Sequence, residues 1–410
     1  MTNVPQTIDD IKTAIQSAGI VGAGGGGFPS HLKIDPRAKT ILLNCAECEP
    51  LIQVDQQLLA NFTVEILSAL HLLAEVLDAT AVVAVKKSYT AAIQAVEREL
   101  RRGDPCGHPQ TTDAICGQAQ GQPLRIKLVT LDETYPAGDE VVLIYEALGI
   151  AVPPGGLPID IGCIVFNVET VLNMYHAFWH DKAVTHKWLT IIGEVKRPAT
   201  VCVPIDMPIA EAVEKYSVDP KIGSTEMSFI VGGPMMGRLA ASTDKITKTT
   251  KAILVLPPDH MLVRKHNSNN SANLNRVASA CCQCRTCTDM CPRNLLGHPI
   301  EPHRIMRAIA ARDAKSAAFT GAMYCSQCGL CEAMACPQSL APRSLIKEVK
   351  TALGKEGVRA EKCEAREVAF SREGRMVSAK RLKMRLGLTK YDVEAPILET
   401  SKICNRMDKL

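Results

Sequence analysis

Two short stretches decide the fold of the carboxyl-terminal half: CCQCRTCTDMCP at residues 281–292 and YCSQCGLCEAMACP at residues 324–337. The first has the spacing C-x2-C-x2-C-x3-C-P, and the second repeats it with one extra residue before its last cysteine. This spacing is typical of ferredoxin-like domains in which three thiolates wrap one [4Fe–4S] cluster and the fourth reaches a second cluster. The pattern therefore predicts a dicluster ferredoxin-like domain at residues 279–350.

Crossed ligation assigns eight of the nine cysteines in the two runs. One cluster is expected on the first three cysteines of the first run and the last of the second, Cys281, Cys284, Cys287 and Cys336. The other is expected on Cys325, Cys328, Cys331 and Cys291. The extra residue, within Glu332 to Ala335, has to form a bulge. Cys282 is an alternative ligand to Cys281, and structural zinc sites are a competing interpretation, although zinc knuckles rarely contain C-x2-C-x2-C.

The composition sets the class of protein. The chain has 410 residues, 17 cysteines and a net charge of only +4, which predicts several domains and gives no reason to expect nucleic-acid binding. Its first residues lack the pattern of a signal peptide, and no apolar run approaches the ~20 residues that span a bilayer. We expect a cytoplasmic protein with reduced cysteines, which meets membranes only through its partners.

The first half of the chain alternates strand and helix patterns. The apolar runs at 41–44 and 81–87 predict buried strands, and 58–77 and 91–101 have apolar residues at helical spacing. Such a βαβ rhythm predicts a Rossmann-like α/β domain with a parallel sheet over residues 1–185. The glycine-rich stretch GIVGAGGGGFPSHLK, residues 19–33, leaves backbone uncovered, so that a phosphate or a flat ring can approach it.

Four blocks in this half carry a family resemblance. GAGGGGFPSHLK, NCAECEP, YPAGDE and VFNVET occur in this order, followed by the cysteine runs. In this order and spacing they resemble the flavin-carrying, NADH-binding subunit of respiratory complex I. They are still more similar to its relatives, the C subunit of the Rnf complex and the cobalamin reductase of propanediol utilisation. The resemblance covers nearly the whole chain.

The resemblance implies ligands for FMN and NADH. FMN would be held by the glycine loop and by polar groups that follow it, Gly22, Gly24, Gly25, Gly27, Lys33, Asn44, Gly138 and Asn167. Glu47 would lie by the flavin, Phe28 would stack on the nicotinamide side, and Glu49 and Glu140 would accept hydrogen bonds from the nucleotide. The chain departs from complex I at Ala23 and Phe166, where complex I has arginine and asparagine.

The remaining segments complete the expected organisation. Residues 186–259 predict strands and a short helix and resemble a β-grasp module of the SLBB type. Residues 260–278 are polar and lack periodicity, which predicts a linker, and 351–410 form a basic carboxyl-terminal extension. The chain is thus expected to be a multidomain α/β protein.

The expected activity follows from this resemblance. We expect an NADH-dependent oxidoreductase of the cobalamin reductase type, which passes electrons through FMN and two [4Fe–4S] clusters to a redox partner protein. The alternative is an Rnf-C-like electron-input subunit of a larger complex, of the Rnf type or the methylenetetrahydrofolate reductase type.

Overall fold

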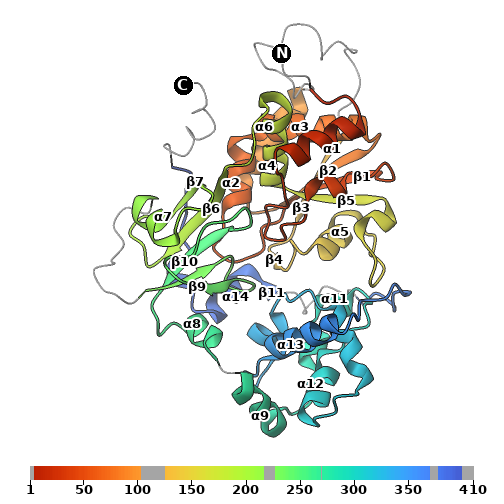
Figure 1. The fold of residues 1–410 in the computed structure, drawn as a ribbon, viewed down its shortest axis with the longest axis vertical. Helices are drawn as coiled ribbons and strands as arrows, with labels where there is room; N and C mark the ends of the chain where they lie inside the picture. The colour runs from red at the N-terminus through yellow and green to blue at the C-terminus, as the bar shows by residue number, and fades with distance from the viewer. Residues whose placement is uncertain (1–3, 103–124, 217–226, 269, 370–376, 399–410) are drawn as a thin grey trace.

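A computed structural model describes residues 4–102, 125–216, 227–268, 270–369 and 377–398. Figure 1 shows an upper lobe that holds a sheet with its helices, a second sheet beside it, and a lower helical lobe built from the cyan and blue segments. The upper lobe contains the glycine-rich blocks, and the lower lobe contains both cysteine runs. The chain is therefore a mixed α/β protein of several modules, as its sequence predicts.

The sheet of the upper lobe is parallel and has the order β3-β2-β1-β5. Its strands are β1 (Thr40–Cys45), β2 (Thr80–Lys86), β3 (Ile126–Leu131) and β5 (Cys163–Asn167). Ile41 and Leu43 point into one apolar core and Leu42 into another. Both faces are thus covered, which explains the nearly continuous apolar runs that predict these strands.

Helices pack on both faces of this sheet. The larger core lies under α1 (Ile8–Ser17), α2 (Val54–Asn61), α3 (Thr63–Val76), α4 (Thr90–Arg102) and α6 (Val168–His180). The opposite face is covered by α5 (Glu140–Leu148). Because β1 lies between β2 and β5, the order of the strands reverses at the β1/β5 pair, the position where open α/β sheets bind ligands.

The helix predicted at 58–77 is two helices, α2 and α3, bent by 90° where they meet at Phe62. Phe62 has a non-helical backbone, and the Thr63 hydroxyl donates to Leu59 O at 2.5 Å. Apolar periodicity continues through this corner because both helices bury one face in the same core. No single helix in the described part of the chain is long and apolar enough to cross a membrane, although this bent pair passes by length and composition together.

The second sheet has the order β7-β6-β10-β8-β9. Its strands are β6 (His186–Gly193), β7 (Ala199–Pro204), β8 (Ser228–Val231), β9 (Arg238–Ala240) and β10 (Ala252–Leu256), with α7 (Ile209–Tyr216) packed on them. The central pair, β6 and β10, is parallel, and the other pairs are antiparallel. The assignment of residues 186–259 as a β-grasp module stays a prediction, and we keep the name β-grasp module for this five-stranded segment.

The lower lobe is helical and carries two small apolar cores. It contains α9 (Asn270–Ala280), α10 (Thr286–Asp289), α11 (Pro292–Leu295), α12 (Pro302–Ala310), η3 (Ala317–Tyr324), the π-helical turn η4 (Cys331–Ala335) and α13 (Pro342–Lys355). Residues 260–278, predicted as a linker without periodicity, contain helices. The described residues of this segment form α8 (Met261–His266) and most of α9, because Leu262, Asn273 and Val277 are buried and fix each helix.

Residues 377–398 are the last described segment of the carboxyl-terminal extension, and we call them the strap. The strap returns to contact the upper lobe and the β-grasp module. Its elements are β11 (Val377–Ser378), α14 (Ala379–Arg385) and η5 (Thr389–Tyr391), and β11 pairs with β4 (Thr134–Tyr135). The Thr200 hydroxyl donates to Ala395 O at 2.9 Å, and Gln53 Nε2 donates to Val393 O at 2.7 Å. The strap thereby ties the β-grasp module to the amino-terminal α/β domain. We call this domain, residues 1–185, the flavin-like domain after the resemblance described above.

Candidate functional site

The structure places the nine cysteines of the two runs around two separate cavities. An outer cavity is lined by Cys281, Cys284, Cys287 and Cys336, together with Cys282. An inner cavity is lined by Cys291, Cys325, Cys328 and Cys331. The last cysteine of each run thus faces the first three of the other run, which is the crossed arrangement expected from the sequence. We call these groups the outer set, without Cys282, and the inner set.

The extra residue of the second run is accommodated locally. Residues Cys331–Ala335 form a π-helical turn, which holds one residue more than an α-helical turn, and Cys336 follows it in an extended conformation. Cys336 therefore still lines the outer cavity. Hydrogen bonds also reach the sulfurs: Gln283 Nε2 donates to Cys281 Sγ at 3.1 Å, and Gln327 Nε2 donates to Cys325 Sγ at 3.2 Å.

These thiols suit a cluster better than a single ion. Among the described residues, no group of three or more His, Cys, Asp or Glu side chains could hold one metal ion. Burial raises the pKa of Cys328 to about 12, and likewise that of Cys291. With such a pKa, these buried cysteines are protonated thiols at neutral pH. They become thiolates only when a metal coordinates the sulfur, because coordination lowers the thiol pKa. The donor chemistry, four sulfurs around each cavity, fits [4Fe–4S] clusters.

The glycine loop lies at the carboxyl edge of β1 and β5. An added Cβ at Gly25 or Gly26 would meet nothing within 4 Å, so this backbone is open. Gly27 N donates to Gly22 O at 3.1 Å and closes the loop. At Gly24, an added Cβ would lie 3.4 Å from Asn167 Nδ2, which places the loop directly against the end of β5.

The other residues expected around FMN lie at the same edge. Asn44 Nδ2 donates to Gly138 O at 3.0 Å, which joins the end of β1 to the start of α5. Lys33 Nζ lies 2.9 Å from Glu140 Oε1 and donates to Val165 O at 3.0 Å. Side chains from four separate sequence blocks thus converge beside the open loop. They supply a cation, amide groups and exposed backbone, which fit a phosphate and a flat ring system.

A buried network of charges lies beneath the loop. Lys187 is paired with Glu169 and donates to Ala23 O at 3.0 Å, and both charged side chains are 1% exposed. Lys251 is paired with Asp55, whose other carboxylate oxygen accepts from Asn167 Nδ2 at 2.8 Å. The two lysines come from the β-grasp module and the acids from the flavin-like domain. The network therefore fixes the two modules against each other below the loop.

Glu47 is the member of this network that remains incompletely satisfied. Its Oε2 accepts from Asp55 N at 3.1 Å, while its Oε1 has no hydrogen-bond partner and lies 3.9 Å from Lys251 Nζ. Burial, followed by the nearby charge of Asp55, raises the pKa of Glu47 to about 8. A neutral carboxyl at this position can donate a proton or a hydrogen bond at pH 7.

Two residues expected to meet the nucleotide have different surroundings. Glu49 accepts from Met235 N and Met236 N, both at 2.8 Å, so its carboxylate is held by the β-grasp module. Burial raises its pKa to about 7. Phe28 is 49% exposed beside the loop, where a ring is available for stacking. The departures Ala23 and Phe166 are both buried, at 3% and 2% exposure, and belong to the packing here.

Several residues of the site escaped the sequence analysis. Lys187, Lys251 and Asp55 of the network lie outside the four blocks, whereas Glu169 lies within VFNVET but was given no role there. A signal was present, because Lys187 and Lys251 adjoin the strongly apolar runs WLTII and AILVL. A lysine that adjoins or enters a buried strand needs an acidic partner, and such a partner has to be sought elsewhere in the chain.

Comparisons with known proteins agree with this geometry. A family model described as the Nuo51 FMN-binding domain matches residues 15–176. A second model, described as a 4Fe-4S dicluster domain, matches residues 280–341. The matches cover the glycine loop and both cysteine runs. They support FMN and [4Fe–4S] clusters as the cofactors and argue against structural zinc.

One relative matches nearly the whole chain, and another matches about two thirds of it. The cobalamin reductase PduS of Citrobacter freundii is 37% identical over 395 residues, which cover 95% of this chain and 81% of that protein. The C subunit of the Na(+)-translocating ferredoxin:NAD(+) oxidoreductase complex of Acetobacterium woodii is 30% identical, and the match covers 70% of this chain and 58% of that protein.

A solved structure shares the fold. It is an NAD+-reducing [NiFe]-hydrogenase in the H2-reduced state, with a TM-score of 0.55 and 18% identity. The match covers 84% of this chain and 62% of the hydrogenase chain. At this identity the likeness concerns the fold alone.

Proposed function

The chain belongs to the family of the cobalamin reductase PduS, and from this premise we propose that it oxidises NADH and delivers the electrons to a partner protein. It is an oxidoreductase with an FMN-binding domain and a 4Fe-4S dicluster domain. Bound FMN would accept a hydride and release single electrons, and bound clusters would carry them.

The residues of the glycine loop and its surroundings would hold FMN. Lys33 supplies a cation for the phosphate, and the open backbone at Gly25 allows the ligand to approach closely. Asn44 and Asn167 supply amides at the ends of β1 and β5. Glu47 would hold a proton beside the ring, and Phe28 would provide a stacking surface for the nicotinamide. Glu49 and Glu140 would reach the nucleotide only by exchanging their present partners.

One contact carries the proposal that the two halves act together. The Tyr135 hydroxyl donates to Cys328 O at 2.6 Å, so the YPAGDE block touches the inner set directly. Tyr135 is 1% exposed and also pairs with the strap through β4 and β11. Arg293 lies two residues after Cys291, and its Nη2 is 3.0 Å from Asp139 Oδ1 at the start of α5. The inner set is thus the one that faces the flavin-like domain.

The outer set is more exposed to solvent than the inner set. Cys284 and the neighbouring Gln283 and Arg285 are exposed, whereas Cys291 and Cys328 of the inner set are buried. An exposed thiolate edge allows a second protein to approach. We therefore place the exit toward a redox partner at the outer set, and the entry from the flavin at the inner set. The curated relatives include subunits of complexes, which agrees with a function that needs a partner.

Anaerobic addition of NADH to the purified, reconstituted chain tests the function. Bleaching of the flavin absorption together with low-temperature EPR signals of reduced clusters is the expected result. If flavin-loaded protein with both clusters does not bleach, NADH is not the donor and the proposal is wrong. Dithionite serves as a control, because it reduces the clusters without the nucleotide.

The second candidate is an electron-input subunit of a larger complex, in which the terminal acceptor binds another chain. Coverage favours the reductase, because the match spans 81% of the cobalamin reductase and 58% of the Acetobacterium protein. Reduction of a corrinoid by the isolated chain with NADH separates the two. Complete inactivity toward corrinoids, in protein whose flavin does bleach, would favour the second candidate.

A further inference from the structure

Arg343 lies in the wall between two hollows of the molecule. It is the second residue of α13, directly after Pro342. On one side it lines the inner cavity, together with the inner cysteine set. On the other side it lines a wider cleft that reaches the β-grasp loop at residues 234–238. The lower lobe in Figure 1 places α13 on the side that faces the sheets.

The guanidinium of Arg343 is only partly paired. Its Nη2 donates to Met236 O at 3.5 Å, which is a long hydrogen bond, and its buried Nε has no hydrogen-bond partner. A buried donor without an acceptor costs about 1–3 kcal/mol, and more when the group is charged. Such an atom in a native fold calls for an explanation, and a bound group that supplies the acceptor is one.

The neighbouring acids cannot satisfy Arg343. Glu49, whose pKa Arg343 affects, is held by two backbone amides of the β-grasp loop. Glu332 lines the same cleft, but its Oε2 accepts from Ser344 N at 3.0 Å and its Oε1 lies 3.0 Å from Lys265 Nζ. Among the described residues Arg343 has no ion pair. Its free donor therefore remains available to the inner cavity.

We propose that the Arg343 Nε–H donates a hydrogen bond to a sulfur of the cluster held by the inner set, and that this bond tunes the cluster's reduction potential. The loop of the inner set allows this approach, because Gly329 has φ +82° and an added Cβ would lie 3.4 Å from Arg343 Cδ. A positive donor at a cluster sulfur stabilises the more negative, reduced state. Arg343 thus raises the reduction potential of the inner cluster.

The outer set offers a matched comparison. The arginine that lines its cavity is Arg285, which is exposed and has its Nε 3.2 Å from Asp289 Oδ1. Solvent and the paired carboxylate screen this charge. The inner set has a second cation from α13, since Lys350 Nζ donates to Cys325 O at 2.7 Å. The same helix therefore places two poorly solvated cations at one cluster, and the other cluster has none of this kind among the described residues.

This inference rests on the proposed ligation of the inner cluster, but not on NADH as donor. The test is a mediated redox titration of the full reconstituted chain, followed by EPR, with iron and sulfide content measured for each variant. Arg343→Gln is expected to shift the midpoint potential of one cluster to a more negative value and to leave the other unchanged. Arg285→Gln, the control, should shift neither comparably.

Arg343→Lys keeps the charge but loses the planar donor, so a smaller negative shift is expected. It also provides the measurement if Arg343→Gln fails to retain the inner cluster. Unchanged potentials in a variant that retains both clusters would overturn the inference. A wild-type chain without two cluster signals would instead contradict the proposed function.

Discussion

The flavin-like domain and the cysteine-rich lobe reach their stability by different means. The first has a large apolar core around a sheet, and its buried acids are paired with protein cations, as Glu169 is with Lys187 of the β-grasp module. The second has two small apolar cores and eight thiols that line two cavities. We therefore expect FMN to bind a site that is already folded in the upper lobe. In the lower lobe we expect the clusters themselves to supply the interactions that an apolar core provides elsewhere.

The largest expected effect is the loss of structure in the lower lobe when iron is removed. Chelation under oxidising conditions should make residues 277–355 sensitive to proteases, because metal-ligand bonds supply much of the folding free energy of small metal-bound domains. The upper lobe should resist under the same conditions. Limited proteolysis with mass spectrometry locates the cuts. Removal of flavin is the control, and equal sensitivity of both lobes would contradict the comparison.

The next effect concerns the buried pair of the upper lobe. Lys187→Met should destabilise the protein by about 3–5 kcal/mol, because Glu169 would remain charged and buried without its partner. Lys33→Met is a matched control, because its pair with Glu140 is partly exposed, at 29% and 39%, and contributes at most ~1 kcal/mol. Urea titrations followed by circular dichroism measure both.

A double variant, Lys187→Met with Glu169→Gln, should recover part of the loss. If Lys187→Met and Lys33→Met cost the same, the buried network does not stabilise the junction of the modules in the way described.

A smaller effect is expected on flavin affinity. Lys33→Met should weaken FMN binding roughly tenfold or more, since a charge-assisted hydrogen bond to a phosphate contributes about 1.5–3 kcal/mol. Lys39→Met is the control, because Lys39 is exposed and lies just before β1, at the opposite end of the strand from Asn44. Quenching of flavin fluorescence on titration of the apoprotein measures the affinity. Equal affinities of the two variants would remove Lys33 from the phosphate site.

The smallest effect, taken per pH unit, is a pH dependence of the stability. The pKa of Glu47 is about 8 in the folded chain, against a usual value of 4.5, so the unfolded chain releases this proton first as pH rises. Stability contributed by this group is therefore greatest at low pH and falls between about pH 5 and 8, by at most about 1.4 kcal/mol per pH unit. Glu47→Gln should flatten this part of the profile in denaturation curves recorded across the range. A profile unchanged by the substitution would place the proton elsewhere.

Predictability from the sequence differed between the lobes for a physical reason. The cysteine runs are local patterns whose spacing dictates a loop around a cluster, and even the extra residue was expected as a bulge, found as the π-helical turn at Cys331–Ala335. The blocks near Gly25, Asn44 and Asn167 likewise mark one edge of a sheet. Their roles as ligands remain predictions.

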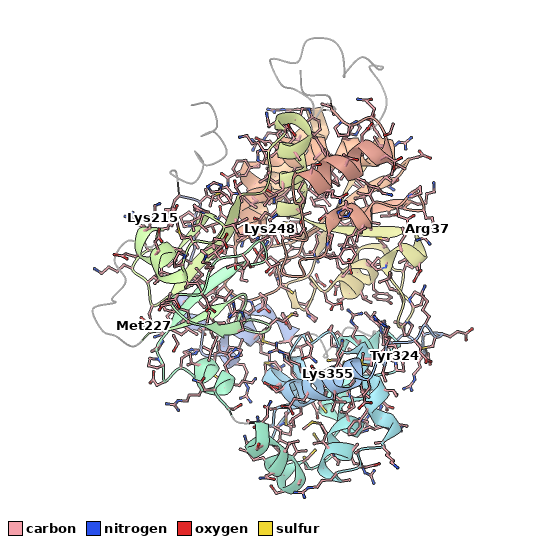
Figure 2. The ribbon with its side chains drawn as sticks, viewed as in Figure 1. Arg37, Lys215, Met227, Lys248, Tyr324 and Lys355 are labelled. Atoms are coloured by element: carbon pink, nitrogen blue, oxygen red, sulfur yellow. The ribbon has the colours of Figure 1, made fainter. Side chains whose placement is uncertain are left out.

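What the sequence did not reveal depends on contacts between distant segments. Lys187 and Lys251 enter the flavin-like domain from another module, so no local spacing connects them to Glu169 and Asp55. The described residues of 260–278 are helical because a few side chains are buried, Leu262 in the large core and Val277 in a core of the lower lobe, which polar composition hides. Figure 2 shows a similar junction at Lys248, whose Nζ donates to Gly19 O at 2.6 Å.

The strap has a consequence for how the chain acquires its structure during synthesis. Among the residues that the structure describes, β4 pairs only with β11, and Thr200, which pairs with Thr190 on one side, bridges Ile397 of the strap on the other. Because these partners are separated by long stretches of chain, their pairing carries a high loop-closure entropy and is expected late. The flavin-like domain therefore emerges from the ribosome with an unpaired edge near Tyr135, and it completes that edge only after the segments for both clusters have been made.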